Sequence, residues 1–244
     1  MKLMIDMGNS RLKWAMTMAG QIMAGPPLAN DRVDRQALIK LWKGIYRPRR
    51  IAVSCVGAGH LLELVQSVAR DLWLDIDVIL VKSQAQAVGV INAYQQPEKL
   101  GVDRWLSLVA VWQKYHCPAC IVDCGTAITV DLINAEGRHQ GGMISPGLTL
   151  MKNALVQGTA ALKFDDTNYL FEPANSTEAA IYSGTLAAAV GLIEHVMSKQ
   201  PTNLQLILTG GDAELIAGQL NVAPSIVDKD LVLRGLLCVL EGRT

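Results

Sequence analysis

The sequence predicts an α/β protein built from two similar halves, and three observations support this. Short apolar strands alternate with amphipathic helices along the 244 residues, which is the pattern of a layered α/β fold. The order of strands and turns at the N-terminus recurs from Cys120 onward. Hydrophobic residues make up 50% of the chain, which is enough for a substantial core.

The first half begins with three short strands joined by turns that contain glycine. We expect them at Leu3–Ile5, Leu12–Met18 and Gln21–Met23. Helical spacing and short apolar runs predict the elements that follow. These are helices at 34–42, 61–73 and 104–115, and strands at 51–54 and 76–81.

The second half repeats this plan with strands at 120–123, 128–133 and 140–144. Asp6 then corresponds to Asp123, and Gly8 corresponds to Gly125. We therefore expect an internal duplication, with domains at 1–116 and 117–244. The remaining elements expected in this half are helices near 147–157, 177–199, 212–220 and 229–240, and a strand at 204–208.

The composition narrows the classes of partner. Lys plus Arg equals Asp plus Glu at 22 each, so no basic surplus favours nucleic acid. No signal peptide is visible before Asp6, and the apolar runs are broken before they reach the length of a membrane span. The five cysteines fit reduced thiols. We expect a cytoplasmic protein without nucleic-acid or membrane partners.

The first loop with candidate chemistry runs from Asp6 to Lys13. A carboxylate at the end of a buried strand is costly unless it serves a partner, and Gly8 allows close approach of an anion. Asn9 and Ser10 add donors, and successive turn amides form an anion-binding nest. Asp6 would hold Mg²⁺, directly or through water. An ordinary hairpin explains this loop equally well when it is considered alone.

The second loop repeats the acid, the glycine and the hydroxyl. Asp123, Gly125, Thr126 and Thr129 match the first arrangement, and Asp131 adds a carboxylate. Two such loops facing one another across a cleft can hold a polyphosphate from both sides. Their recurrence therefore favours the phosphate-binding interpretation of each.

Two more glycine clusters lie where a strand is expected to give way to a helix, at 141–147 and 209–212. Amides at such a helix start can face an anion, although each cluster is also an ordinary turn. Four loops of this kind at strand ends in an α/β chain indicate a nucleotide site.

The segment Gly101-Val102-Asp103-Arg104 opens an apolar helix between the halves. Asp103 is a candidate general base for a substrate hydroxyl, and Arg104 is a candidate partner for an anionic group of the substrate. A helix N-terminal cap is the alternative interpretation of the same residues.

Together these motifs resemble those of the type III pantothenate kinases in order and spacing, over nearly the full length. The resemblance implies membership of the superfamily of acetate and sugar kinases, heat-shock chaperone ATPases and actin. The implied fold has two duplicated ribonuclease-H-like domains with a nucleotide cleft between them. The implied reaction is phosphorylation of pantothenate by ATP to 4′-phosphopantothenate, the first step of coenzyme A synthesis. The motifs lie at 6–13, 101–104, 123–127, 141–147 and 209–211.

The resemblance also implies roles for particular residues. Asp103 matches the acid that deprotonates the pantothenate hydroxyl, and Asp123 matches a ligand of a monovalent cation, potassium or ammonium. The family is dimeric, and the partner subunit helps to bind substrate. Ser10 stands where the family commonly has Thr, which retains the hydroxyl. The implied ATP contacts are Asp6, Met7, Gly8, Asn9, Ser10, Arg11, Leu12, Lys13 and Thr126, and the implied pantothenate contacts are Tyr94, Gly101, Val102, Asp103, Arg104 and Thr177.

Other interpretations remain. The chain could be another small-molecule kinase of the same superfamily, or a non-catalytic accessory or regulatory protein on this fold. Acids at 6, 103 and 123 favour a working enzyme. Cys117 and Cys120 invite a zinc or redox role, but the pair precedes a strand and lacks a second paired motif. The four histidines are scattered, which gives a hydrolase triad little support.

Overall fold

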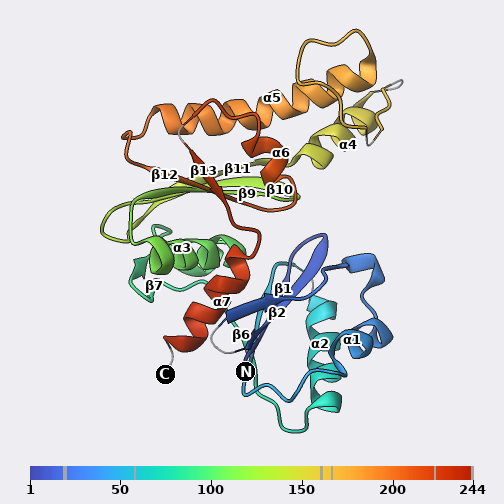
Figure 1. Ribbon diagram of the computed structural model, residues 1–244, viewed down its shortest axis with the longest axis vertical. Coiled ribbons are helices and arrows are strands. Elements are labelled where there is room, and N and C mark those ends of the chain that lie inside the picture. The colour runs from blue at the N-terminus through green and yellow to red at the C-terminus, as the bar shows by residue number, and fades with distance from the viewer. Residues whose placement is uncertain (19–20, 58, 160–161, 166, 223, 243–244) are drawn as a thin grey trace. The chain divides into compact units, whose positions relative to one another are not determined.

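The structure is a computed structural model that describes residues 1–18, 21–57, 59–159, 162–165, 167–222 and 224–242 (Figure 1). The chain forms two compact units, each built around its own sheet. The first unit comprises Met1–His116, Gly137–His139 and Asp230–Thr244, and the second comprises Cys117–Glu136 and Gln140–Lys229.

The first unit therefore includes more of the chain than the segment 1–116 expected from the sequence. Its C-terminal helix α7 (Leu231–Glu241) packs on α3 (Val102–Tyr115) and on the first sheet. The cause is the apolar surface of α7, whose buried residues include Leu233, Leu236 and Leu240. An ion pair of 2.8 Å between Lys2 and Glu241 joins the two ends of the chain within this unit.

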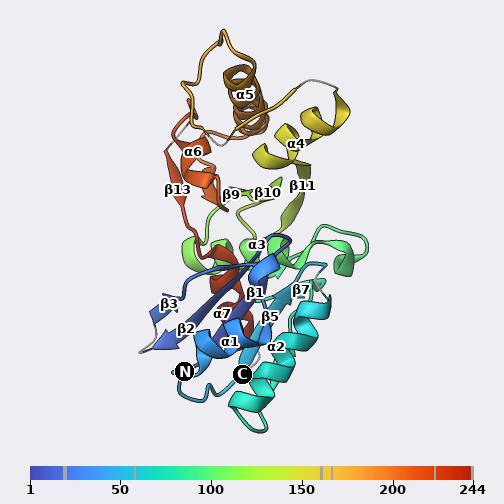
Figure 2. The same cartoon turned by 90° about the vertical axis from the view of Figure 1, so that its right-hand side faces the viewer.

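The sheet of the first unit has the strand order β3-β2-β1-β5-β6, with β4 paired to β2. The hairpin strands run antiparallel, whereas β5 and β6 run parallel to β1. Helices α1 and α2 cover one face, and α7 covers the other (Figures 1 and 2). The elements are β1 (Leu3–Met7), β2 (Arg11–Met18), β3 (Gln21–Ala24), β4 (Leu28–Ala29), η1 (Asn30–Arg32), α1 (Arg35–Trp42), β5 (Ile51–Cys55), α2 (Gly59–Leu72), β6 (Val78–Leu80), β7 (Gln86–Ala87), β8 (Val90–Ile91) and η2 (Pro97–Lys99).

Alternation along β1 separates the core from the functional face. Leu3, Ile5 and Met7 enter the core cluster that β1 shares with α1 and α2. Because successive side chains of a strand point to opposite faces, Asp6 lies on the other face. The apolar core thus holds the strand in place while one carboxylate is turned away from it.

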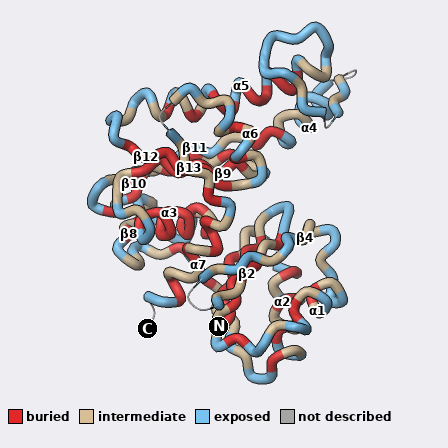
Figure 3. The backbone as a smooth tube through the Cα atoms, in the orientation of Figure 1, coloured by how far each residue is buried: buried red, intermediate tan, exposed pale blue. Residues whose placement is uncertain are grey.

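The second unit has the strand order β11-β10-β9-β12-β13. Its core joins this sheet to α5 and α6, which lie over one face of the sheet (Figure 1). Figure 3 shows α5 as a mixture of buried and exposed positions. The elements are β9 (Ala119–Cys124), β10 (Ala127–Ile133), β11 (His139–Pro146), α4 (Leu148–Gly158), α5 (Thr177–Ser198), β12 (Gln205–Thr209), α6 (Ala213–Ala217) and β13 (Ser225–Val227).

The two sheets share one topology. In each, the central strand pairs antiparallel with the strand that follows it in the hairpin and parallel with a strand from later in the chain. Each sheet then continues with one more parallel strand. This agreement is the structural form of the duplication that the sequence predicts. Every strand and helix expected from the sequence overlaps an observed element, whereas the two- and three-residue strands β4, β7, β8 and β13 were not expected.

Candidate active site

Three polar residues lie side by side on the first sheet. Asp6 of β1 is directly opposite Lys13 of β2 and directly beside Ser54 of β5. Paired residues on neighbouring strands point to the same face, so the three side chains form one row. We call Lys13, Asp6 and Ser54 the first row.

The carboxyl group of Asp6 is buried, and its residue is only 7% exposed. Loss of hydration raises its pKa from 3.8 to about 6, and the nearby Asp103 adds to the rise. The Ser54 hydroxyl, which donates a 2.7 Å hydrogen bond to Oδ1, and the Lys13 ammonium both act to lower this pKa. Burial therefore destabilises the ionised form of Asp6. A bound cation would stabilise that form, so this carboxylate is suited to accept one.

The predicted phosphate loop is the tight turn between β1 and β2. The Gly8 amide donates to the carbonyl of Arg11 at 3.1 Å, which closes the turn, and Asn9 and Ser10 at its tip are exposed. Met7 and Leu12 flank the turn with side chains that are fully buried. Those two residues can therefore meet a phosphate only through their backbone.

Asp103 lies in the first turn of α3, whose N-cap is Gly101 without a side-chain cap. The N-terminal cap interpretation of Asp103 is therefore wrong. Its Oδ1 instead accepts a 2.8 Å hydrogen bond from the Arg104 amide. A β-carbon at position 101 would lie 2.6 Å from this same oxygen, so glycine at that position is what lets the carboxylate sit there.

Arg104 is a buried cation, only 6% exposed. Its Nη1 donates a 2.9 Å hydrogen bond to the Tyr94 hydroxyl, and its guanidinium carbon lies 5.7 Å from the centre of the Tyr94 ring. His139 also stacks on that ring, at 6.1 Å between centroids. Asp103, Arg104 and Tyr94, predicted as substrate contacts, thus lie in the same unit as Asp6, and Val102 beside them is buried.

The second sheet carries an equivalent row of different chemistry. Asp123 of β9 is directly opposite Thr129 of β10 and directly beside Thr209 of β12. Thr129, Asp123 and Thr209 form the second row. It offers one carboxylate and two hydroxyl groups, and all of these can present oxygen to a hard cation.

The other glycine clusters of the second half converge on the Asp123 loop. The amide of Gly147 donates to the Thr126 carbonyl at 2.9 Å, and the amide of Asp212 donates to the Cys124 carbonyl at 3.0 Å. Gly210 has a φ of +98°, and a β-carbon there would lie 2.6 Å from Oδ1 of Asp123. The clusters at 141–147 and 209–212 therefore meet at one place in the second unit, and Thr126 is exposed there.

Thr177, predicted to contact pantothenate, begins α5 and is exposed. It lines an apolar groove of about 690 Å³ with residues of α4 and the rest of α5, including Met151, Leu155 and Ile181. Its environment is thus apolar, unlike that of the predicted acids Asp6, Asp103 and Asp123.

Protein groups alone do not form a metal cage in the described part of the chain, where no three His, Cys, Asp or Glu side chains come together. Mg²⁺ is commonly bound by one or two carboxylates together with substrate phosphates, so the single buried Asp6 fits a metal that arrives with a nucleotide. The oxygen atoms of the second row likewise fit a monovalent cation.

The thiols of the second unit are poorly suited to redox work. Burial raises the pKa of Cys120 to about 12 and raises that of Cys124 further. The thiolate is the reactive form of cysteine, so these two side chains are neutral core residues of β9 at neutral pH.

Several polar residues near the predicted ones were not predicted from the sequence as site residues. Ser54 interrupts an otherwise apolar strand, which was a usable signal, and Thr209 had been noted only as part of a glycine cluster. His139 and Asn30 gave no signal, because their contacts with Tyr94 and with the first loop join segments far apart in the chain.

The fold places the chain in the class of actin-like ATPase folds, and solved structures bear this out. A conserved protein from Campylobacter jejuni, named for the Baf family of transcriptional activators, has a TM-score of 0.63 at 21% identity and covers 99% of this chain and 98% of its own. The activator of 2-hydroxyisocaproyl-CoA dehydratase from Clostridium difficile, with bound ADPNP, has a TM-score of 0.58 at 14% identity, with 99% and 93% covered. Likenesses at these identities concern the fold alone.

Sequence comparison identifies the family within that class. Residues 2–199 match the family described as type III pantothenate kinase. A type III pantothenate kinase from Nitrosococcus oceani is 37% identical over 259 residues, which cover 97% of this chain and 92% of the relative. Another, from Acinetobacter baumannii, is 35% identical over 237 residues, with 96% and 95% covered. The chain belongs to the type III pantothenate kinase family.

Proposed function

We propose that this chain transfers the γ-phosphoryl group of ATP to the primary hydroxyl of pantothenate, giving 4′-phosphopantothenate in the first step of coenzyme A synthesis. Membership of the family supports the reaction. The observation that carries it is the carboxylate of Asp103 in the first turn of α3, held by the Arg104 amide in the same unit as the buried Asp6, whose pKa it helps to raise. A base beside a buried acid that can carry a metal is what a phosphotransferase needs.

In this proposal Asp103 takes the proton from the pantothenate hydroxyl. The hydroxyl oxygen forms a bond to the γ-phosphorus, the bond from that phosphorus to the bridging oxygen breaks, and ADP leaves. Asp103 then releases its proton to solvent. Asp6 would hold Mg²⁺ together with ATP and Asp123 would hold K⁺ or NH₄⁺, and these ions would supply positive charge that stabilises the phosphates.

The remaining residues bind and orient the substrates. Lys13 and the turn at Gly8–Ser10 would attract phosphate oxygens, while Asp6 in its ionised form would hold the metal. Thr126 contributes a hydroxyl to ATP from the second loop. Arg104, held by the Tyr94 hydroxyl, is preorganised to bind the carboxylate of pantothenate, and burial strengthens that ion pair.

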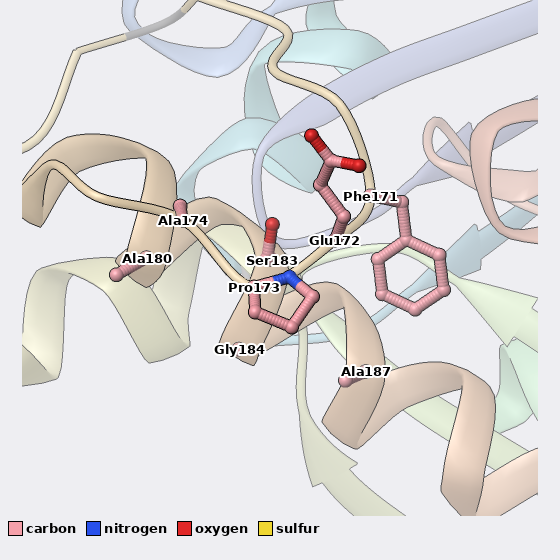
Figure 4. A pocket seen from close by; sticks show the side chains of 8 residues that line it. All are labelled: Phe171, Glu172, Pro173, Ala174, Ala180, Ser183, Gly184 and Ala187. Atoms are coloured by element: carbon pink, nitrogen blue, oxygen red, sulfur yellow. The ribbon is translucent and has the colours of Figure 1, made fainter.

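We also assign a homodimer to the chain, supported by an exposed apolar surface on the second unit. Met143 and Ile144 of β11 and Leu150 of α4 are large apolar side chains that are between 46% and 65% exposed, and exposed apolar side chains gather at contact sites. Pro173 and Phe171 border a second hollow on α5, of about 410 Å³, whose floor is built of small residues (Figure 4). Light scattering should give twice the mass of one chain, and a monomer would contradict this assignment.

The proposed dimer also accounts for the apolar composition of α5. Among the described residues, α5 is a helix long and apolar enough to cross a membrane, and 44% of the relevant window is buried within the structure. Core packing on one side and a partner subunit on the other account for such a helix without a bilayer. We therefore propose a cytoplasmic enzyme.

A coupled assay of ADP release tests the proposed reaction. ADP should form when pantothenate is added, and Asp103→Asn should lower kcat by about 10²- to 10⁴-fold, the usual contribution of a general base. Asp75→Asn is a matched control, because this exposed residue has a φ of 55°, which Asn also tolerates.

The outcomes separate the alternatives. ADP release with another small alcohol or acid, but not with pantothenate, would indicate a different kinase of this superfamily. No ADP release with any such substrate would favour an accessory or regulatory protein. An Asp103→Asn variant with a near-normal rate would exclude the general-base role.

A further inference from the structure

Asn30 lies outside the predicted phosphate loop, and its hydrogen bonds hold that loop in shape. Asn30 follows directly after β4, the two-residue strand that pairs with the start of β2 at Arg11 and Leu12. This pairing brings Asn30 against the turn at Gly8–Ser10, although it lies 20 positions after Ser10 in the chain. No sequence motif marks the position.

Asn30 binds three successive carbonyl groups of the loop. Its Nδ2 donates 2.9 Å hydrogen bonds to the carbonyls of Gly8 and Asn9. Its backbone amide donates to the Ser10 carbonyl at 3.0 Å. One residue thus collects the negative ends of three consecutive peptide dipoles on one side of the turn.

This arrangement fixes the direction of the loop amides. In a planar trans peptide, the carbonyl oxygen and the N–H of the next residue point in opposite directions. Because the carbonyls of Gly8 and Asn9 point at Asn30, the N–H groups of Asn9 and Ser10 point to the opposite side. Successive N–H groups directed to one side form an anion-binding concavity.

The environment of Oδ1, the acceptor atom of the Asn30 side-chain amide, supports a specific role for this residue at the loop. Oδ1 is buried and has no hydrogen-bond partner among the residues that the structure describes, and a buried acceptor of this kind ordinarily destabilises a protein. Rotating the amide would place Oδ1 against two carbonyl oxygens, so the two donor bonds fix its orientation. The two hydrogen bonds from Nδ2 to the loop are therefore formed at the cost of leaving Oδ1 unsatisfied.

We propose that Asn30 is a positioning residue for ATP: it turns the amides of Asn9 and Ser10 toward the nucleotide phosphates by holding the carbonyls of Gly8 and Asn9. The inference rests on the proposed function for the identity of the nucleotide. It acts through the loop, since Asn30 itself lies on the carbonyl side, away from the anion.

Asn30→Asp is the sharpest test, because it keeps the shape and replaces the two donors with an oxygen acceptor. Loss of two side-chain hydrogen bonds should weaken ATP binding, measured by calorimetry with Mg·ATP, by about tenfold or more. KM for ATP should rise in parallel while KM for pantothenate stays within about twofold. Asn30→Ala should weaken ATP binding less than Asn30→Asp, because it adds no repulsive charge.

Asn134→Ala is the matched control. Its side chain also bonds a turn, accepting a 3.1 Å hydrogen bond from the Glu136 amide, but it follows the end of β10 in the second unit and belongs to neither row. This variant should bind ATP as the unchanged protein does. Normal ATP affinity in folded Asn30 variants, or equal losses of ATP and pantothenate affinity, would overturn the inference.

A measurement on the unchanged protein keeps the inference testable if the variants fold poorly. Addition of Mg·ATP should shift the amide nitrogen and proton resonances of Asn9 and Ser10, and the Asn30 side-chain amide should shift much less. If Mg·ATP binds without moving the two loop amides, the inference fails. Calorimetric binding does not require turnover, so a chain that binds ATP but does not phosphorylate pantothenate would contradict the proposed function alone.

Discussion

The two units place the same residue type at the same point of the same sheet, yet surround it differently. Asp6 lies between Lys13 and Ser54, and Asp123 lies between Thr129 and Thr209. The first acid is almost fully buried beside a cation, whereas the second is half-buried between two hydroxyl groups. The duplicated backbone therefore carries two candidate sites of different chemistry.

The flanking residues explain how the two sites differ. A lysine opposite the first acid offers positive charge to a phosphate, and the acid itself can then serve a divalent metal bound with that phosphate. Two hydroxyls beside the second acid add oxygen ligands without adding charge, which suits a cation of lower charge. The symmetry of the fold thus sets the position of each acid, and its two neighbours set the chemistry.

The largest expected effect comes from exchanging the two acids for amides. Asp6→Asn should lower kcat/KM for ATP by 10²-fold or more, at every K⁺ concentration, because the metal and its phosphates lose a charged ligand. Asp123→Asn should instead weaken activation by K⁺ and leave Mg·ATP binding within several-fold of normal. Steady-state rates across a K⁺ titration measure both.

A K⁺ dependence that changes equally in the two variants would break the comparison, because the two rows would then serve a single ion. A control such as Asp75→Asn should leave the K⁺ titration unchanged.

The next effect concerns stability. Because the folded pKa of Asp6 is raised from 3.8 to about 6, the folded state holds a proton that the unfolded state has lost within that range. Stability therefore falls as pH rises from about 4 to about 6 and then levels off. The shift is worth roughly 3 kcal/mol at about 1.4 kcal/mol per pKa unit. Asp6→Asn should thus raise the free energy of unfolding at pH 7 by up to that amount.

Urea unfolding of the nucleotide-free protein between pH 4 and pH 8 measures this difference. The gain from Asp6→Asn should shrink toward zero below about pH 4, where Asp6 is protonated in both states. A gain of equal size at every pH would show that the amide acts through packing and that the acid titrates normally.

The smallest expected effect concerns Ser54 and Thr209, the residues beside Asp6 and Asp123 on the neighbouring parallel strands. Ser54→Ala removes the hydrogen bond that favours ionised Asp6, so the pKa of Asp6 should rise further and Mg·ATP binding should need a higher pH. The expected loss of affinity near pH 6 is several-fold, consistent with about 1 kcal/mol for one hydrogen bond. Thr209→Val, its counterpart in the second row, should alter the response to K⁺ and leave the pH profile of Mg·ATP binding in place.

Calorimetry with Mg·ATP at a series of pH values reads out this pair of variants. Equal pH profiles for Ser54→Ala and the unchanged protein would mean that Ser54 does not tune Asp6.

Much of the fold could be predicted because the signals are local. The hairpin strands alternate with turns that contain glycine, and the helices carry apolar stripes of helical spacing. Short strands such as β4 and β13 were not predicted, because two or three residues are too few to show the alternation of a strand. The inclusion of α7 in the first unit was also not predicted, because the apolar stripe of α7 does not indicate that it packs on α3.

The sequence by itself determined the duplicated α/β plan, the family, and the candidate acids Asp6, Asp103 and Asp123. These follow from short motifs, whose chemistry depends on residues adjacent in the chain. Only the tertiary structure decided that Ser54 bonds Asp6, that Arg104 is held by Tyr94, and that Asn30 holds the first loop. Each of those contacts joins segments separated by loops or helices, and a pattern along the chain carries no record of which distant polar group the folded sheet brings alongside.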